Sequence, residues 1–152
     1  MRKSIKSMLG VTLLEIMLVL AIAAMIIVMS VRYYQSAQSS QQANNMVQQL
    51  LGIAAAADGL AQSTGSYSRV SAVSLGPLLP GGTATGFMTP WGATMIFASE
   101  GPTSYTITGL DMPAGVCPLV KSRLTQNNHY TGVTCDSVTY SSTGVATPPA
   151  GG

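Results

Sequence analysis

Charged side chains are scarce in this chain, and so are the residue types on which most catalytic sites depend. Lysine and arginine together number seven, and aspartate and glutamate five, among 152 residues. His129 is the only histidine, and nothing in the sequence pairs it with a nucleophile. The chain has no glycine-rich phosphate-binding loop, no paired carboxylates in its C-terminal part and no Ser-His-Asp set. The sequence therefore argues against an enzyme, and we expect no catalytic residue.

Metal ligands are equally sparse. One histidine and two cysteines do not make a zinc site, because a second cysteine pair is missing. The acids after Asp58 are Glu100, Asp111 and Asp136, which are too few for an oxygen-rich calcium site. We therefore expect neither a metal nor another cofactor.

Helix-breaking residues are missing from most of the N-terminal third. No proline occurs before Pro77, and no glycine occurs between Gly10 and Gly52. Residues 11–31 form an apolar run of 21 residues whose only charge is Glu15. About 20 apolar residues suffice for a helix to cross a bilayer. The three bases that precede the run (Arg2, Lys3 and Lys6) predict a cytoplasmic N-terminus, with the bulk of the chain across the membrane.

The helix is expected to continue beyond the membrane. After Arg32 the chain turns polar, and apolar residues then recur at helical spacing at Met46, Leu50, Ile53, Ala57 and Leu60. This pattern indicates an amphipathic helix that has one face covered by a domain and that ends near Gly65.

The C-terminal part carries strand signals, so the fold class predicted is α+β. Residues 93–99 and 103–108 flank Glu100-Gly101-Pro102, a plausible hairpin. A short helix is expected at 113–124, and further strands at 129–134 and 137–141. Residues 66–84 read as a connecting loop that lies on the domain, and residues 142–152 as a mobile tail.

Three kinds of side chain in this part have specific interpretations. Trp91, Phe87 and Phe97 are expected in the core. His129 is expected in a solvated surface turn. Cys117 and Cys135 are either a disulfide or two buried thiols, and a disulfide is favoured if the domain is exported.

An ordinary secretory signal peptide explains the N-terminus less well. A secretory apolar region spans about 7–15 residues and ends in a small-residue cleavage site. Here the run is longer, and its one A-x-A match, residues 21–23, lies inside it. Glu15 would also be out of place in such a region.

The junction Gly10-Val11-Thr12-Leu13-Leu14-Glu15 resembles the processing site of type IV prepilins. In that family a membrane peptidase cuts after the glycine and methylates the new N-terminal amine, here that of Val11. The acid five residues beyond the cut, here Glu15, is the family's hallmark. Val11 replaces the usual Phe, as in the type IVb branch.

Weaker matches extend the resemblance to bundle-forming type IVb pilins and to the thin-pilus pilins of conjugative plasmids. They are Tyr33-Tyr34-Gln35-Ser36-Ala37, Asp58-Gly59-Leu60, Gly65-Ser66-Tyr67-Ser68, Pro90-Trp91-Gly92 and the region of Cys117.

The resemblance implies an organisation and a function. Residues 1–10 would be the leader peptide, 11–31 the transmembrane and filament-core half of a long helix, and 32–64 its amphipathic half. Residues 65–152 would form a β-rich globular domain with a disulfide loop at 117–135. The chain would be a pilin, stored in the bacterial inner membrane and assembled into an extracellular pilus for adhesion, aggregation or conjugation.

The resemblance also implies partners: other copies of the chain, the prepilin peptidase, the inner-membrane assembly machinery and, before assembly, the membrane itself. No nucleic acid is expected to bind directly. Without the leader, four bases face five acids, so no basic patch remains.

Individual residues acquire roles from the same resemblance. Glu15 would pair with the N-terminal amine of a neighbouring subunit and set axial register; the alternative is an incidental charge that snorkels to the interface. Thr12 either caps the helix start or is merely tolerated. Gly10 is either the residue before the cut or a flexible hinge.

Two other functions stay open. A type II secretion pseudopilin or a minor pilin would share the same export route, although pseudopilins commonly bind calcium and lack a disulfide. A monomeric periplasmic binding module on a single-span anchor would need no cleavage at Gly10 and would leave Glu15 unexplained.

Overall fold

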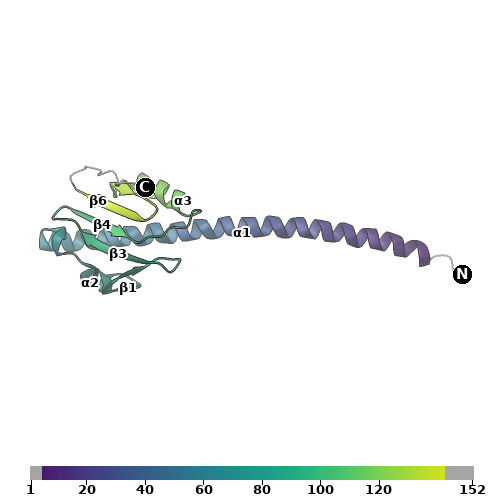
Figure 1. Cartoon of the computed structure of the whole chain (residues 1–152), viewed down its shortest axis with the longest axis horizontal. Helices are drawn as coiled ribbons and strands as arrows, with labels where there is room; N and C mark the ends of the chain where they lie inside the picture. Colours follow the sequence, from purple (N-terminus) through teal and green to yellow (C-terminus); the bar gives the residue numbers. More distant parts are fainter. Residues whose placement is uncertain (1–4, 143–152) are drawn as a thin grey trace. The chain divides into compact units, whose positions relative to one another are not determined.

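The computed structural model describes the backbone of residues 5–142 and the side chains of residues 12–142. Within that range the fold is α+β, with a long N-terminal helix and a six-stranded antiparallel sheet (Figure 1). The chain comprises two compact units, residues 1–38 and 39–152. Most of the predicted tail, residues 143–152, lies outside the described residues.

Helix α1 spans Ile5–Thr64. It ends where the sequence predicts, because Gly65 adopts a φ of +77° that favours glycine. The hydroxyl of Thr64 donates to the carbonyl of Leu60 at 2.8 Å and satisfies one of the last acceptors. The helix begins before Val11, since no proline interrupts residues 5–10 and one glycine costs only about 1 kcal/mol.

One face of α1 packs into the core of the 39–142 region, as predicted from its periodicity. Figure 1 shows this part of α1 running along strands β3 (Thr94–Ser99) and β4 (Ser104–Thr108). The α1 side chains buried in the core are those of Ala43, Met46, Leu50, Ile53, Ala54, Ala57 and Ala61. They share one hydrophobic cluster with sheet residues such as Phe87, Tyr105 and Val138.

The sheet has the strand order β1-β2-β3-β4-β6-β5. The predicted hairpin is confirmed: β3 (Thr94–Ser99) pairs antiparallel with β4 (Ser104–Thr108). Strand β6 (Ser137–Ser141) matches its prediction and pairs with β4. Strand β5 is shorter than the predicted 129–134 and covers only Gly132–Val133.

Residues 66–84 are more structured than the predicted loop. They contain η1 (Tyr67–Arg69), α2 (Ala72–Leu75), η2 (Gly76–Leu78) and β1 (Gly82–Thr83), and β2 (Gly86–Met88) follows. A Cβ atom at Gly76 would lie 2.9 Å from the carbonyl oxygen of Thr83, so glycine permits the close contact of η2 with β1.

Helix α3 spans Cys117–Asn127, later than the predicted 113–124. The carbonyl of Pro113 accepts hydrogen bonds from the backbone N–H groups of Val116 and Cys117, at 2.9 and 3.0 Å, in a turn that precedes the helix. Asn128 ends the helix in the left-handed conformation, with a φ of 55°.

Candidate functional site

The N-terminal part of α1 presents apolar side chains around its circumference. In this unit Leu14 is 72% exposed and Met29 is 71% exposed, and the apolar side chains between them are mostly exposed as well. The helix is long and apolar enough to span a membrane. So much exposed apolar surface requires either lipid or other protein around it.

Glu15 is the only charged residue of this apolar stretch. With Thr12, Ile16, Val19 and Leu20 it lines a shallow groove of about 350 Å³ on the helix surface. Among residues with described side chains, the nearest base in the sequence is Arg32, roughly 25 Å away along the helix at 1.5 Å per residue. Among residues 12–142, whose side chains are described, Glu15 therefore has no base close enough to neutralise its charge.

The other predicted residues of the processing site lie at the edge of the described region. The backbone of Gly10 and Val11 belongs to α1, but their side-chain surroundings are outside the described residues. Thr12 lies on the same helix face as Glu15, three residues before it, and is exposed.

The end of the apolar stretch is marked by Arg32, Tyr33 and Tyr34. Tyr33 is 80% and Tyr34 is 64% exposed. The amide of Gln38 donates to the hydroxyl of Tyr34 at 3.1 Å, one turn later. Tyrosines at this position are typical of the boundary between a membrane and water.

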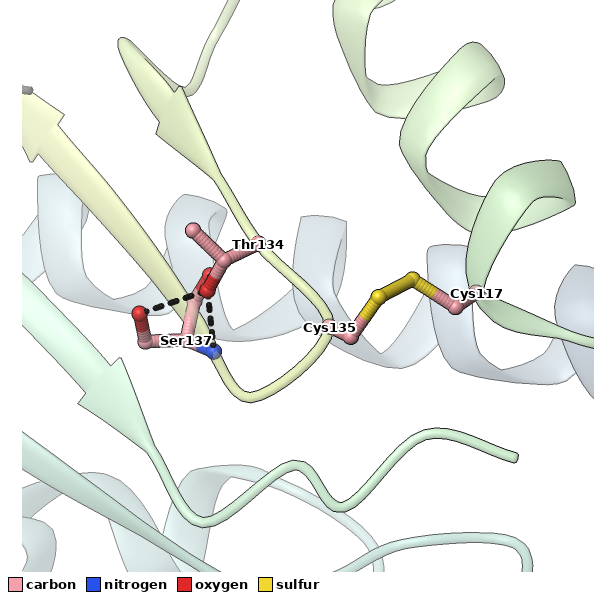
Figure 2. The surroundings of a disulfide bond; sticks show 4 residues. All are labelled: Cys117, Thr134, Cys135 and Ser137. Atoms are coloured by element: carbon pink, nitrogen blue, oxygen red, sulfur yellow. Dashed lines mark hydrogen bonds between the residues drawn. A yellow bond between two sulfur atoms is a disulfide. The ribbon is translucent and has the colours of Figure 1, made fainter. Parts of the chain in front are cut away.

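Cys117 and Cys135 form a disulfide that connects the first residue of α3 to the loop between β5 and β6 (Figure 2). Their Cα atoms are 5.4 Å apart. Cys117 is buried, whereas Cys135 is exposed. The backbone N–H of Met112 donates to the carbonyl of Cys135 at 3.1 Å, so the disulfide loop is also hydrogen-bonded to the segment that precedes α3.

A tight turn orders the C-terminal end of this disulfide loop. The hydroxyl of Thr134 accepts a hydrogen bond from the backbone N–H of Ser137 at 2.9 Å (Figure 2). The backbone N–H of Thr134 donates to the carbonyl of Ser137 at 2.8 Å. The turn directs Cys135 toward α3 and lets β6 begin at Ser137.

His129 lies in the turn between α3 and β5, as predicted, but its side chain is half-buried rather than fully solvated. Its ring stacks on that of Tyr140 with centroids 4.8 Å apart and an interplanar angle of 14°. Its Nε2 atom lies 3.2 Å from the hydroxyl oxygen of Tyr105. Because Tyr105 and Tyr140 come from paired strands, this contact depends on strand register, which the sequence around His129 does not reveal.

Two tyrosines connect α1 to the rest of the domain. The hydroxyl of Tyr67 donates to the carboxylate of Asp58, and that of Tyr130 donates to the carbonyl of Leu50 at 2.6 Å. Burial and the hydrogen bond to Asp58 raise the pKa of Tyr67 above its usual range. Burial likewise raises the pKa values of Tyr105 and Tyr130. Sequence reasoning missed these contacts, because no local pattern reveals them: Tyr67 reaches back past the end of α1 to Asp58, and Tyr130 lies 80 positions from Leu50.

The aromatic residues predicted for the core are confirmed there. Phe87 and Phe97 are buried, and Trp91 packs partly buried against the same cluster. The indole N–H of Trp91 donates to the carbonyl of Leu110 at 2.8 Å. Its polar atom is therefore satisfied inside the protein, which is the usual arrangement for a structural tryptophan.

A polar groove of about 580 Å³ lies beside the His129–Tyr140 pair, between the end of α3 and β6. Lys121, Asn128 and Thr131 contribute to its lining. Within the described residues, no group of three or more histidine, cysteine, aspartate or glutamate side chains is arranged to hold a metal ion.

Comparisons with protein-family models, with curated proteins and with solved structures found no match for this chain. The functional argument therefore depends on the sequence and the geometry of the described residues.

Proposed function

We propose that the chain is a structural subunit of a type IV pilus, resembling the type IVb pilins. The inner membrane stores the subunit, and the N-terminal helix then assembles it into an extracellular filament. The filament serves adhesion, aggregation or conjugation.

The observation that supports this proposal most is the combination of an apolar helix surface with one carboxylate. The exposed apolar side chains of residues 13–31 are suited to lipid before assembly and to neighbouring helices after it. Glu15 supplies the single charge, on the side of the helix that carries Thr12. An isolated carboxylate in an apolar medium is costly and attracts a positive partner strongly.

Cleavage after Gly10 would create that partner, because it leaves a free amine on Val11. The amine of one subunit then pairs with Glu15 of its neighbour. Buried pairs of this kind contribute little net stability, since desolvation offsets the attraction, but they can specify one register. The pair therefore selects the axial position of each new subunit.

Replacing Glu15 tests this role. Glu15→Gln keeps the shape of the side chain and removes its charge, and Glu100→Gln, at an exposed acid in the β3–β4 turn, is the matched control. We expect the Glu15 variant to be cleaved and inserted normally but to yield at least about tenfold less sheared filament, while the control assembles normally. Filament yield is measured by immunoblot of sheared and membrane fractions. Normal yield from Glu15→Gln would refute the register role.

A further inference from the structure

Asp58 is an isolated charge in the last part of α1. No other Asp, Glu, Lys, Arg or His occurs between Arg32 and Arg69. The side chain of Asp58 is half-buried, so its carboxylate loses part of the water that would otherwise solvate it. A positive group beside the carboxylate would replace that solvation, and the attraction would be stronger than on an open surface.

The hydrogen-bond partner of Asp58 is a neutral group. The hydroxyl of Tyr67 donates to one oxygen of the carboxylate. Burial and this hydrogen bond raise the pKa of Tyr67, so the phenol stays protonated and brings a donor but no charge. An ionised carboxylate accepts up to about four hydrogen bonds, so one phenol uses only part of its capacity.

An open groove of about 420 Å³ lies beside this hydrogen bond. Its walls include Asp58 and Gln62 from α1, Tyr67 from η1, Pro102 from the β3–β4 turn and Tyr140 from β6. The described residues that line it comprise one acid and no base. The volume is within the usual range of small-ligand pockets.

The groove has a negative part and an apolar part. Its negative part consists of Asp58 and the last turn of α1, to which Gln62 belongs, because the carbonyl end of a helix carries partial negative charge. Its apolar part is an aromatic wall, in which the ring centroids of Tyr67 and Tyr140 are 5.5 Å apart. A ligand that matches both parts has a positive end and an apolar chain.

The aromatic wall is ordered before any ligand binds. The ring of Tyr140 stacks on those of Tyr105 and His129, with centroids 5.1 and 4.8 Å away. The backbone N–H of Tyr67 donates to the carbonyl of Pro102 at 3.1 Å and holds η1 against the β3–β4 turn. Binding in this groove therefore has little side-chain and backbone entropy to overcome.

We propose that this groove binds an alkylammonium ion, with the ammonium group at Asp58 and the alkyl chain along the rings of Tyr67 and Tyr140. A primary ammonium donates several hydrogen bonds, which suit both the carboxylate and the carbonyl groups at the end of α1. The inference is independent of the proposed function, because it requires neither cleavage after Gly10 nor assembly.

Other ligands suit the groove less well. Calcium takes many oxygen ligands, usually from several carboxylates, whereas Asp58 is the one acid among the described lining residues. Anions would be repelled by Asp58. Residues 143–152 contain no lysine or arginine, so this segment cannot supply the cation. A free amine and the lysine side chain of another protein both present the proposed group, and the test distinguishes them.

The first test is a titration of the full-length chain, in micelles of a nonionic detergent, with butylammonium chloride. The signals of ¹³C-labelled tyrosine rings are followed by NMR and assigned from Tyr67→Phe and Tyr140→Phe variants. We expect the Tyr67 and Tyr140 signals to shift with a dissociation constant of about 1 mM or less. 1-Butanol, which has the same chain and no charge, should cause no shift. The absence of a saturable shift with butylammonium would overturn the proposal.

Charge variants locate the binding site. Asp58→Asn keeps an oxygen that can accept from Tyr67 and removes the charge, and Asp136→Asn, at an exposed acid outside the groove, is the matched control. We expect at least about tenfold weaker binding to Asp58→Asn and unchanged binding to Asp136→Asn. Equal affinities of Asp58→Asn and the unaltered chain would overturn the proposal.

Two further variants keep Asp58 in place, in case its replacement impairs folding. Gln62→Lys puts a tethered ammonium four residues after Asp58, the spacing at which an acid and a lysine pair on a helix, and should weaken butylammonium binding at least about tenfold. Unchanged binding to Gln62→Lys would contradict the proposal. Binding that appears only after Arg69→Gln would also overturn it, because a base of the chain itself would then fill the groove.

Two probes distinguish the sources of the ammonium group. 1,4-Diaminobutane represents a free amine, and acetyl-Gly-Lys-Gly-amide represents a lysine side chain of a protein. Tighter binding of the diamine would support a free amine as ligand, and tighter binding of the peptide would support a lysine-bearing partner. These measurements use the unassembled chain, so a negative result would leave the proposed pilin function intact.

Discussion

Removal of the Cys117–Cys135 disulfide should cost the folded domain about 3 kcal/mol. The two cysteines are 18 positions apart in the sequence. Closing a loop of this size in the unfolded chain accounts for roughly 3 kcal/mol in the chain-entropy model. The pairings of β4 with β6 and of β5 with β6 do not involve the sulfur atoms, so the native sheet should persist. The cost should appear as lower stability rather than as a changed fold.

The assay is urea unfolding of the full-length chain in detergent micelles, followed by the fluorescence of Trp91, its only tryptophan. Cys117→Ala with Cys135→Ala avoids burying a hydroxyl at the buried Cys117 site. We expect a lower urea midpoint with an unchanged slope, and a melting temperature lower by about 12 °C or more for a domain of about 100 residues. The reduced wild-type protein should behave in the same way. A loss below about 1 kcal/mol would refute the reasoning, because it would mean that the bond does not restrict the unfolded chain.

Three further predictions concern the core and its pH dependence. Tyr130→Phe removes the hydrogen bond to Leu50 and should lower the free energy of unfolding by about 1 kcal/mol in the same urea assay; an unchanged midpoint would contradict the contact. Gly109→Ala should lower the free energy of unfolding by about 2 kcal/mol or more, because Gly109 has a φ of +78° and a Cβ atom would lie 2.7 Å from a carbonyl oxygen. Gly59→Ala, in open space on α1, should raise the free energy of unfolding by up to about 1 kcal/mol. Burial raises the pKa values of Tyr105 and Tyr130 in the folded chain, so above about pH 10 the unfolded chain loses protons that the folded chain keeps. These two tyrosines should leave the free energy of unfolding unchanged below about pH 10. Above that pH, each of them should lower it by up to about 1.4 kcal/mol per pH unit. Urea midpoints between pH 7 and 11, with absorbance at 295 nm, test this expectation, and equal midpoints at pH 9 and 11 would contradict it.

The elements that could be predicted from the sequence are those whose apolar residues repeat at a clear spacing, or those that end at a residue such as glycine or proline. Helix α1 is recognisable because Met46, Leu50 and Ile53 recur at helical spacing and Gly65 follows its end. The β3–β4 hairpin is recognisable because two β-branched and aromatic runs flank a Gly-Pro turn. In each case local residues and tertiary packing favour the same structure.

The elements that the sequence does not predict depend on contacts between distant residues. Strands β1 and β2 are too short to show alternation, and their glycines are present because backbones approach closely at Gly76 and Gly82. The predicted start of α3 at Pro113 is too early, because Pro113 begins a separate turn that precedes the helix. The stacking of His129 on Tyr140 requires knowledge of the strand pairing, which no local pattern supplies.

The candidate site also has one part that the sequence predicts and one part that it does not. Glu15 and the apolar run around it are recognisable from the sequence, because one charge among 21 residues is conspicuous. The polar groove beside His129 and Tyr140 is not, because its lining comes from two separate elements, α3 and β6.

The measurement that tests the central claim most directly is the intact mass and N-terminal residue of the protein from its native host. The account predicts a chain that begins at N-methylated Val11, with residues 1–10 removed. A chain that still begins at Met1 in a host with an active prepilin peptidase would contradict it, because Gly10 would then not be a processing site and Glu15 would have no amine to meet.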